Sequence, residues 1–226
     1  MKINSLGAKI EELVLKGENV FFNGMRGDGK VGVTHPCTPN FGKDMTAYGL
    51  PQHGPMRNSE CQILTDEINH KKLSYDILHD KYPSGMNVVQ DFSIQNDRFI
   101  LETTHANNSG EYLPVNFGEH CYFDTPKGWD GVEVNGKDIT ELVKTNGTIK
   151  LLDKNTIKIP GKKEMILEQV GLDFAVVWVF QNPDTKEFDK NYVCIEPLQR
   201  PVDSFGKPES MIKNGEASKT VLEIFL

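Results

Sequence analysis

The stretch FSIQNDRFILETTH, residues 92–105, decides the fold class of this chain. Apolar and polar residues alternate on both sides of a polar turn at 95–97, and a period of two residues indicates half-buried strands. Two such strands joined by so short a turn predict an antiparallel hairpin. The stretch TIKLLDKNTIKIP at 148–160 has the same pattern and predicts a second hairpin around 153–155.

Other short segments extend this pattern along the chain. The dipeptide Asn135-Gly136, inside 132–137, is the strongest short signal for a hairpin turn. Further strand candidates, rich in β-branched and aromatic residues, are 175–181, 192–198 and 220–226. Many short strands separated by turn residues predict an all-β sandwich or barrel in one domain over 1–226. Residues 9–15 and 66–80 fit either a strand or a helix.

Composition narrows the kinds of partner. Lys and Arg total 25 against 32 Asp and Glu, a net charge of −7, which disfavours nucleic acid and anionic membrane surfaces. The longest apolar run, at 174–180, is far shorter than the ~20 residues of a membrane span. With no signal-peptide pattern at the N-terminus, we expect a cytoplasmic protein. The four cysteines are scattered, which predicts free thiols and no zinc site.

The first segment with unusual chemistry is YGLPQHGPMRN, residues 48–58. Gly54 beside His53 indicates a tight backbone path that presents an imidazole. The forked donors of Arg57 suit sugar hydroxyls or a phosphate. The alternative is a surface loop whose histidine is simply exposed.

The second segment is NFGEHCYFD, residues 116–124. His120 follows a glycine and a glutamate, and imidazole is the side chain best suited to donate and accept a proton near neutral pH. The alternative is a structural histidine that is hydrogen-bonded at a strand edge. A metal site made of His120 and Cys121 is disfavoured because adjacent strand residues point to opposite faces. We therefore expect no metal.

The third segment is YVCIEPLQRPVD, residues 192–203. Alternation puts Tyr192, Cys194 and Glu196 on one face of the predicted strand. A carboxylate on an otherwise apolar strand is costly unless it is paired or functional. Partial burial would raise the pKa of Glu196 and make it a better base near pH 7. The alternative is a salt bridge, for instance to Arg200.

A histidine acid and a glutamate base suit the ring opening of a cyclic hemiacetal. The base removes the proton of the anomeric hydroxyl while the acid protonates the ring oxygen, and the open aldehyde then rotates and closes again. Nothing is oxidised or hydrolysed, so we expect no cofactor, in keeping with the lack of a P-loop or G-x-G-x-x-G motif. A hydrolase is less favoured because glycoside hydrolysis normally uses two carboxylates.

The three segments together resemble the aldose 1-epimerases of the galactose mutarotase-like superfamily. The family motifs His-Gly-x-x-Arg, Gly-x-His-Pro-Tyr-Phe and Cys-x-Glu-Pro look like residues 53–57, 118–123 and 194–197. Their order along the chain also fits the family, so the resemblance covers nearly all of the chain. It implies a large antiparallel β-sandwich with a sugar site in a cleft on one sheet.

The resemblance also implies roles for individual residues. His120 would be the general acid and Glu196 the general base. His53 and Arg57 would bind the substrate. Asp173 lies roughly where some members carry a substrate-binding aspartate. The implied partner is a small sugar or sugar phosphate, bound by a monomer or homodimer.

The chain departs from the family pattern in several places. It is shorter than most members, and Cys121 replaces the usual proline after the acid. Both features leave open a non-catalytic carbohydrate-binding or regulatory homologue. Residues 31–36 lack the arginine that the hexose-6-phosphate epimerases carry there, so a free hexose and a hexose phosphate both stay open. The strand at 220–226 would be able to pair with a second copy if it lay at a sheet edge.

Overall fold

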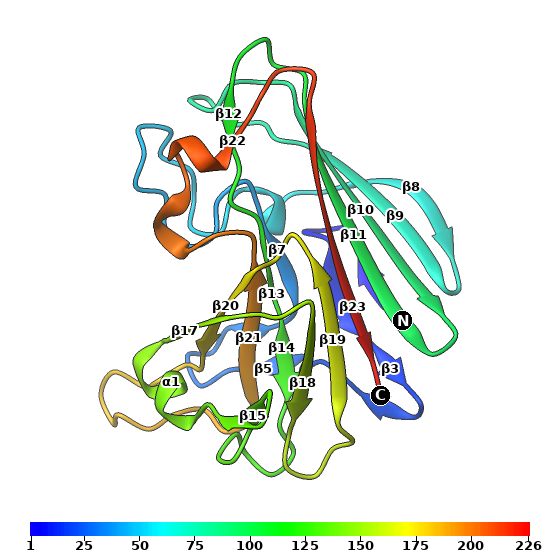
Figure 1. Ribbon diagram of the computed structural model, residues 1–226, viewed down its shortest axis with the longest axis vertical. Helices are drawn as coiled ribbons and strands as arrows, with labels where there is room; N and C mark the ends of the chain where they lie inside the picture. The colour runs from blue at the N-terminus through cyan, green and yellow to red at the C-terminus, as the bar shows by residue number, and fades with distance from the viewer.

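The computed structural model describes all 226 residues and consists almost entirely of strands (Figure 1). Two antiparallel sheets form the body of the molecule, which confirms the predicted all-β class and sandwich architecture. The single α-helix, α1 (Thr140–Thr145), is one short connection, and three 3-10 turns lie at Met56–Asn58, Val202–Ser204 and Pro208–Ser210. No helix of the chain is long and apolar enough to cross a bilayer.

The larger sheet has nine strands. Their spatial order is β16 (Lys137–Asp138), β15 (Glu133–Val134), β18 (Lys154–Lys158), β19 (Met165–Val170), β23 (Ala217–Phe225), β11 (Arg98–Asn107), β10 (Met86–Gln95), β9 (His70–Asp76) and β8 (Gln62–Glu67). Segments 9–15 and 66–80 are therefore both extended, since β9 falls in the second and β2 (Lys9–Glu12) with β3 (Val14–Leu15) in the first.

The smaller sheet has six strands. In spatial order they are β17 (Thr148–Lys150), β20 (Phe174–Trp178), β21 (Tyr192–Leu198), β13 (Gly118–His120) and β7 (His35–Cys37), with β14 (Tyr122–Asp124) also paired to β21. Short two-stranded pairs decorate the body: β1 (Lys2–Asn4) with β2, β3 with β4 (Glu18–Asn19), β5 (Gly24–Met25) with β6 (Val31–Gly32), and β12 (Leu113–Pro114) with β22 (Met211–Ile212).

Two of the predicted hairpins are confirmed. β10 and β11 pair along their whole length, and the two linking residues, Asn96 and Asp97, both have positive φ, at 51° and 59°. Asn135 and Gly136, at 53° and 72°, join β15 to β16 in the same way. Positive φ at both central residues gives the turn a twist that matches the flanking strands.

The hairpin predicted at 148–160 is wrong. Both strands exist, but β17 pairs with β20 in the smaller sheet, whereas β18 pairs with β15 and β19 in the larger one. The chain crosses between the sheets here, where the Leu152 N–H donates to the side chain of Asn155. A two-residue period specifies which face is buried, but not which strand is the neighbour.

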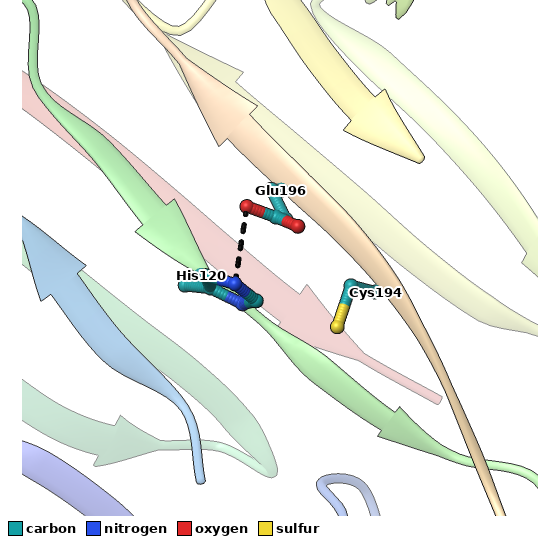
Figure 2. A group of neighbouring side chains, drawn as sticks. All are labelled: His120, Cys194 and Glu196. Atoms are coloured by element: carbon teal, nitrogen blue, oxygen red, sulfur yellow. Dashed lines mark ion pairs between the residues drawn. The ribbon is translucent and has the colours of Figure 1, made fainter. Parts of the chain in front are cut away.

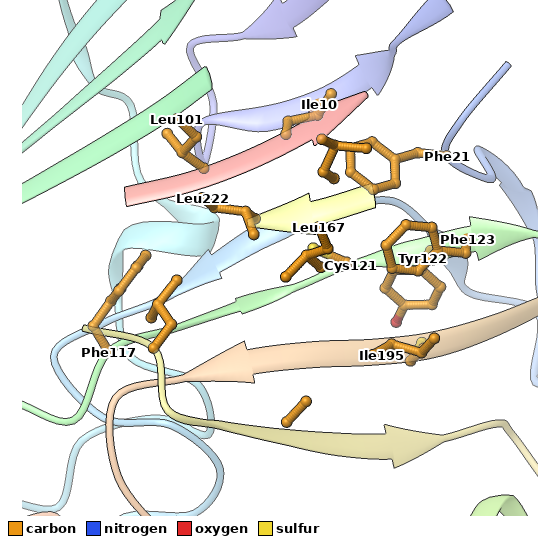
Figure 3. Close-up of a cluster of buried hydrophobic side chains, with 14 of the residues drawn as sticks. Ile10, Phe21, Leu101, Phe117, Cys121, Tyr122, Phe123, Leu167, Ile195 and Leu222 are labelled. Atoms are coloured by element: carbon orange, nitrogen blue, oxygen red, sulfur yellow. The ribbon is translucent and has the colours of Figure 1, made fainter. Parts of the chain in front are cut away.

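A continuous core of 46 buried residues fills the space between the sheets. Figure 3 shows Leu167 and Leu222 of the larger sheet near Cys121, which lies between β13 and β14, with Leu101 and Ile195 on either side of them. Each of these side chains is at most 2% exposed. Burial of apolar area on this scale is the main stabilising contribution to such a fold.

The last strand, β23, is not at an edge. It lies between β11 and β19 and pairs with both (Figure 1). Its backbone groups are therefore already used within the sheet, and the condition for pairing with a second copy through 220–226 is not met. The free edges of this sheet are β16 and β8.

Candidate active site

The pairing of the smaller sheet puts the predicted site residues on one face. His120 ends β13 directly opposite His35 of β7. On β21, Cys194 and Glu196 are two residues apart and point to the same side. Figure 2 shows the side chains of His120, Cys194 and Glu196 gathered between the two strands. Two segments that are over seventy residues apart in the sequence thus meet at one point.

His120 and Glu196 form the centre of the site. The Nε2 atom of His120 lies 3.5 Å from Oε2 of Glu196, and the side chains are 7% and 3% exposed. Burial raises the pKa of Glu196 well above its usual value. Burial holds the pKa of His120 well below its usual value, and the charges of Arg57 and Arg26 act in the same direction. The structure alone therefore favours the uncharged pair, because burial penalises both ions.

The uncharged pair carries the proton that an acid–base reaction needs. Glutamic acid with neutral imidazole and glutamate with imidazolium contain the same number of protons. Moving one proton from Glu196 to His120 gives a carboxylate base and an imidazolium acid. A bound polar ligand that stabilises charge would favour this form.

The ring of His120 packs against two aromatic rings that also neighbour each other, with 6.3 Å between the centroids of His35 and Tyr122. It stacks on Tyr122 with 4.6 Å between centroids and 9° between planes, and on His35 at 4.9 Å and 25°. Tyr122 is itself fixed by Arg26, whose Nη1 donates to the phenol oxygen at 2.8 Å. The packing therefore leaves the imidazole of His120 little freedom to rotate.

His53 enters the site from a strained loop. His53 and Gly54 both have positive φ, at 64° and 75°. The Gly42 N–H donates to Nδ1 of His53 at 3.2 Å, and the thiol of Cys37 lies 3.0 Å from the same nitrogen. Because Nδ1 accepts, Nε2 carries the hydrogen. Burial and the charge of Arg57 lower the pKa of His53 to about 4, so the ring is neutral.

His35 has the opposite tautomer. Its Nδ1 lies 2.8 Å from the carbonyl oxygen of Val33, which can only accept, so Nδ1 carries the hydrogen. Burial lowers the pKa of this ring to about 3. The two histidines thus differ in tautomer: Nε2 of His53 carries the hydrogen, whereas Nε2 of His35 carries a lone pair and is buried without a hydrogen-bond partner.

These groups line a pocket of about 450 Å³. Four of the five predicted residues lie in it together: His53, Arg57, His120 and Glu196. Other side chains that the sequence did not indicate also line the pocket, among them Arg26, His35, Tyr122 and Trp178. Tyr122 lies inside the motif at 118–123, which is the one signal that points to it. Arg26 carried none, since only the β5–β6 hairpin brings it here.

Asp173 is not brought to this pocket. It is exposed and lines separate grooves beside Gly171. It directly precedes Phe174, which pairs with Leu198, whereas the pocket wall is formed further along the strand at Val176 and Trp178. Register therefore places Asp173 beyond the site.

The salt-bridge alternative for Glu196 is also resolved. The only ion-pair contact of Glu196 is with His120, and Arg200 lines a different groove.

The alternative of an exposed loop histidine fails for His53, which is only 8% exposed. Cys121 packs into the core rather than into the pocket. Its replacement of the family proline therefore removes no group from the site.

A larger groove of about 1000 Å³ lies on the outer face of the nine-stranded sheet. Its one histidine, His70, contacts Asp91 at 2.7 Å, and Lys72 pairs with the same carboxylate. These side chains are partly exposed and satisfy one another. The smaller pocket holds the buried groups that have strongly shifted pKa values and is the better candidate site.

Comparison with known proteins identifies the family. The family model described as aldose 1-epimerase matches residues 1–222, so the chain belongs to the aldose 1-epimerase family. A search of curated proteins finds no match.

Solved structures share the fold at low sequence identity. A putative aldose 1-epimerase from Escherichia coli K12 matches with a TM-score of 0.77 and 16% identity, over 99% of this chain and 94% of the other. A galactose mutarotase-like protein from Lactobacillus casei ATCC 334 matches with a TM-score of 0.78 and 15% identity, over 99% and 95%. Galactose 1-epimerase from Lactobacillus acidophilus NCFM matches with a TM-score of 0.67 and 10% identity, over 99% and 89%.

Proposed function

We propose that this protein is a mutarotase, which interconverts the α and β anomers of a hexose or hexose phosphate. Glu196 takes the proton of the anomeric hydroxyl and His120 donates one to the ring oxygen. The carbon–oxygen bond of the ring breaks, the aldehyde rotates, and the same two groups in reversed roles close the ring. The observation that carries this proposal is the buried contact of 3.5 Å between His120 and Glu196.

The remaining pocket groups support the binding of a polyhydroxylated ring. His53 and Gln52, whose side chains meet at 3.3 Å in the lining of the pocket, are polar groups that can satisfy both roles of a hydroxyl group. The indole of Trp178 gives an apolar surface suited to the C–H face of a sugar. Family membership supports the same chemistry.

The unpaired positive charges at the pocket suit a phosphate group on the substrate. Arg57 and Lys30 line the pocket and have no ion-pair partner in the protein, whereas Arg26 is paired with Asp28. Free cations at a pocket suit an anionic substituent. We therefore propose that hexoses and hexose 6-phosphates be compared, with Arg57→Gln tested on both. A larger loss for the phosphate would assign Arg57 to that group.

The acid–base pair is tested by anomer exchange, followed by NMR or polarimetry on freshly dissolved α-glucose, α-galactose and their 6-phosphates. Glu196→Gln and His120→Asn should each slow exchange by roughly 10²–10⁴-fold, the usual contribution of a positioned acid or base. Glu60→Gln, an exposed change outside the pocket, is the matched control and should keep the full rate. If the wild-type protein binds sugars but never exceeds the buffer rate, it is a carbohydrate-binding homologue instead.

A further inference from the structure

Cys194 is a buried thiol for which anomer exchange has no use. It is fully buried and shares its strand face with Glu196. The ligating atoms of His120, Cys194 and Glu196 all lie within 4.8 Å of one another (Figure 2). One imidazole, one thiol and one carboxylate therefore lie close together, with His120 and Glu196 in the lining of the pocket and Cys194 in the core beside them.

This set of atoms matches the coordination chemistry of zinc. Zn²⁺ binds Cys sulfur at about 2.3 Å and His nitrogen or carboxylate oxygen at about 2.0–2.2 Å in a tetrahedron, so its ligand atoms lie roughly 3.3–3.8 Å apart. The 3.5 Å between His120 Nε2 and Glu196 Oε2 already falls in this range. Because no two of the ligand atoms are more than 4.8 Å apart, bringing the thiol of Cys194 into place needs a side-chain shift of at most about 1 Å.

Charge and position favour the same ion. Thiolate and carboxylate together neutralise a divalent cation, so the buried site carries no net charge. The thiolate selects soft or borderline ions, whereas Mg²⁺ and Ca²⁺ require six or more oxygen ligands that this wall does not offer. His120 and Glu196 both face the pocket, which leaves the fourth ligand position to water.

We propose that His120, Cys194 and Glu196 form a binding site for a thiophilic divalent cation such as Zn²⁺. The bound ion coordinates both proton-transfer groups and lies where the anomeric centre would react. Binding of the ion and turnover of the sugar therefore exclude each other, and the cation acts as an inhibitor.

Binding is measured directly, without reference to activity. Wild-type protein is titrated with Co²⁺ as a spectroscopic stand-in for zinc, and with Zn²⁺ in competition with a chromophoric chelator. A thiolate-to-cobalt charge-transfer band together with four-coordinate ligand-field bands is expected at one ion per chain. No binding, or binding without the thiolate band, would overturn the proposal whether or not the protein is a mutarotase.

Variants identify the ligands. Cys194→Ser keeps the shape of the side chain and should lose the thiolate band. Its Zn²⁺ affinity should fall further than the about 10–100-fold that is lost when a residue hydrogen-bonded to a metal ligand is replaced. Glu196→Gln should weaken Zn²⁺ but keep the band. Cys61→Ser, a buried cysteine elsewhere, is the matched control and should change neither. A band lost in Cys61→Ser but kept in Cys194→Ser contradicts the assignment; circular dichroism checks that each variant is folded.

Inhibition is the second readout. The rate of anomer exchange is measured for each protein without added ion, with micromolar Zn²⁺, and after EDTA is added. Each rate is expressed relative to the rate of the same protein without added ion. The wild type should be inhibited and restored by EDTA, Mg²⁺ should have no effect, and Cys194→Ser should be far less sensitive. Zn²⁺ that binds at the site while exchange continues undiminished would refute the mutual exclusion.

Discussion

Tyr122 shows how one residue fixes another at the site. Its ring covers His120 almost in parallel, and its hydroxyl is held by Arg26. A general acid loses much of its effect when it is misplaced by even 1 Å, which can cost on the order of 10²-fold in rate. Tyr122 is thus a positioning residue with two separable contacts.

Substitution separates the two contacts of Tyr122. Tyr122→Phe keeps the stacked ring and should lower kcat by less than about threefold, whereas Tyr122→Leu removes the ring and should lower it by roughly 10-fold or more. The check is kcat for anomer exchange together with the NMR shifts of the His120 ring. Equal losses in both variants would mean that the hydroxyl, and not the stack, does the positioning.

Glu119, beside His120 in sequence, points the other way into the core. It is fully buried, and the one hydrogen bond to its carboxylate comes from Gln90 Nε2 at 3.3 Å. Burial raises the pKa of Glu119 to about 8. Because the pKa of Glu119 is raised in the folded protein, the contribution of this group to stability is fully present below the unfolded value of 4.5 and is lost as pH rises through about 8.

Replacing Glu119 should remove that pH dependence. Glu119→Gln should be more stable than the wild type at pH 8 by a few kcal/mol, and nearly equal to it at pH 4, because only the wild type must bury a carboxylate at high pH. Urea unfolding at several pH values measures this. The exposed change Glu12→Gln should show no such trend. A gain that is constant across pH would mean that packing, not ionisation, is responsible.

At the scale of elements, the loop that carries His53 depends on one glycine. A Cβ atom on Gly54 would lie 1.8 Å from the carbonyl oxygen of Thr38, at a φ of +75°. The Thr38 N–H donates to the carbonyl of His53, so loop and β7 are joined at the same place. Only glycine allows this close backbone approach.

Gly54→Ala is therefore expected to cost more than about 2 kcal/mol of folding free energy and to displace His53 from the pocket. Gly49→Ala is the matched control: Gly49 also has positive φ, at +62°, but nothing lies near its missing Cβ, so the cost should be about 1–2 kcal/mol. Thermal unfolding and sugar binding measure the two effects. Equal stability and binding in both variants would contradict the close-approach argument.

At the scale of the whole molecule, stability depends on the core between the sheets. Leu222 lies on β23, the strand between β11 and β19, and is 1% exposed. Leu222→Ala should destabilise the protein by about 2–5 kcal/mol, because the substitution leaves a cavity in the core between the two sheets. Leu64→Ala, at a position 47% exposed on the edge strand β8, should change stability by less than about 0.5 kcal/mol. Chemical denaturation of both compares them, and similar losses would argue against a single shared core.

The sequence by itself determined the all-β class and the hairpins at 96–97 and 135–136. These follow from local rules, since alternation sets which face is buried, and residues that accept positive φ, Asn-Asp and Asn-Gly, set the turns. The motifs that the chain shares with the family, in their order along the chain, indicated His53, Arg57, His120 and Glu196 as site residues.

Tertiary structure alone decided which strands pair and which groups meet. It sent β17 and β18 to different sheets, placed β23 inside its sheet and kept Asp173 out of the pocket. It also brought in Arg26 and His35 and set Cys194 beside the acid–base pair. The physical reason is that strand register is fixed by contacts between segments far apart in the chain, to which no local pattern refers.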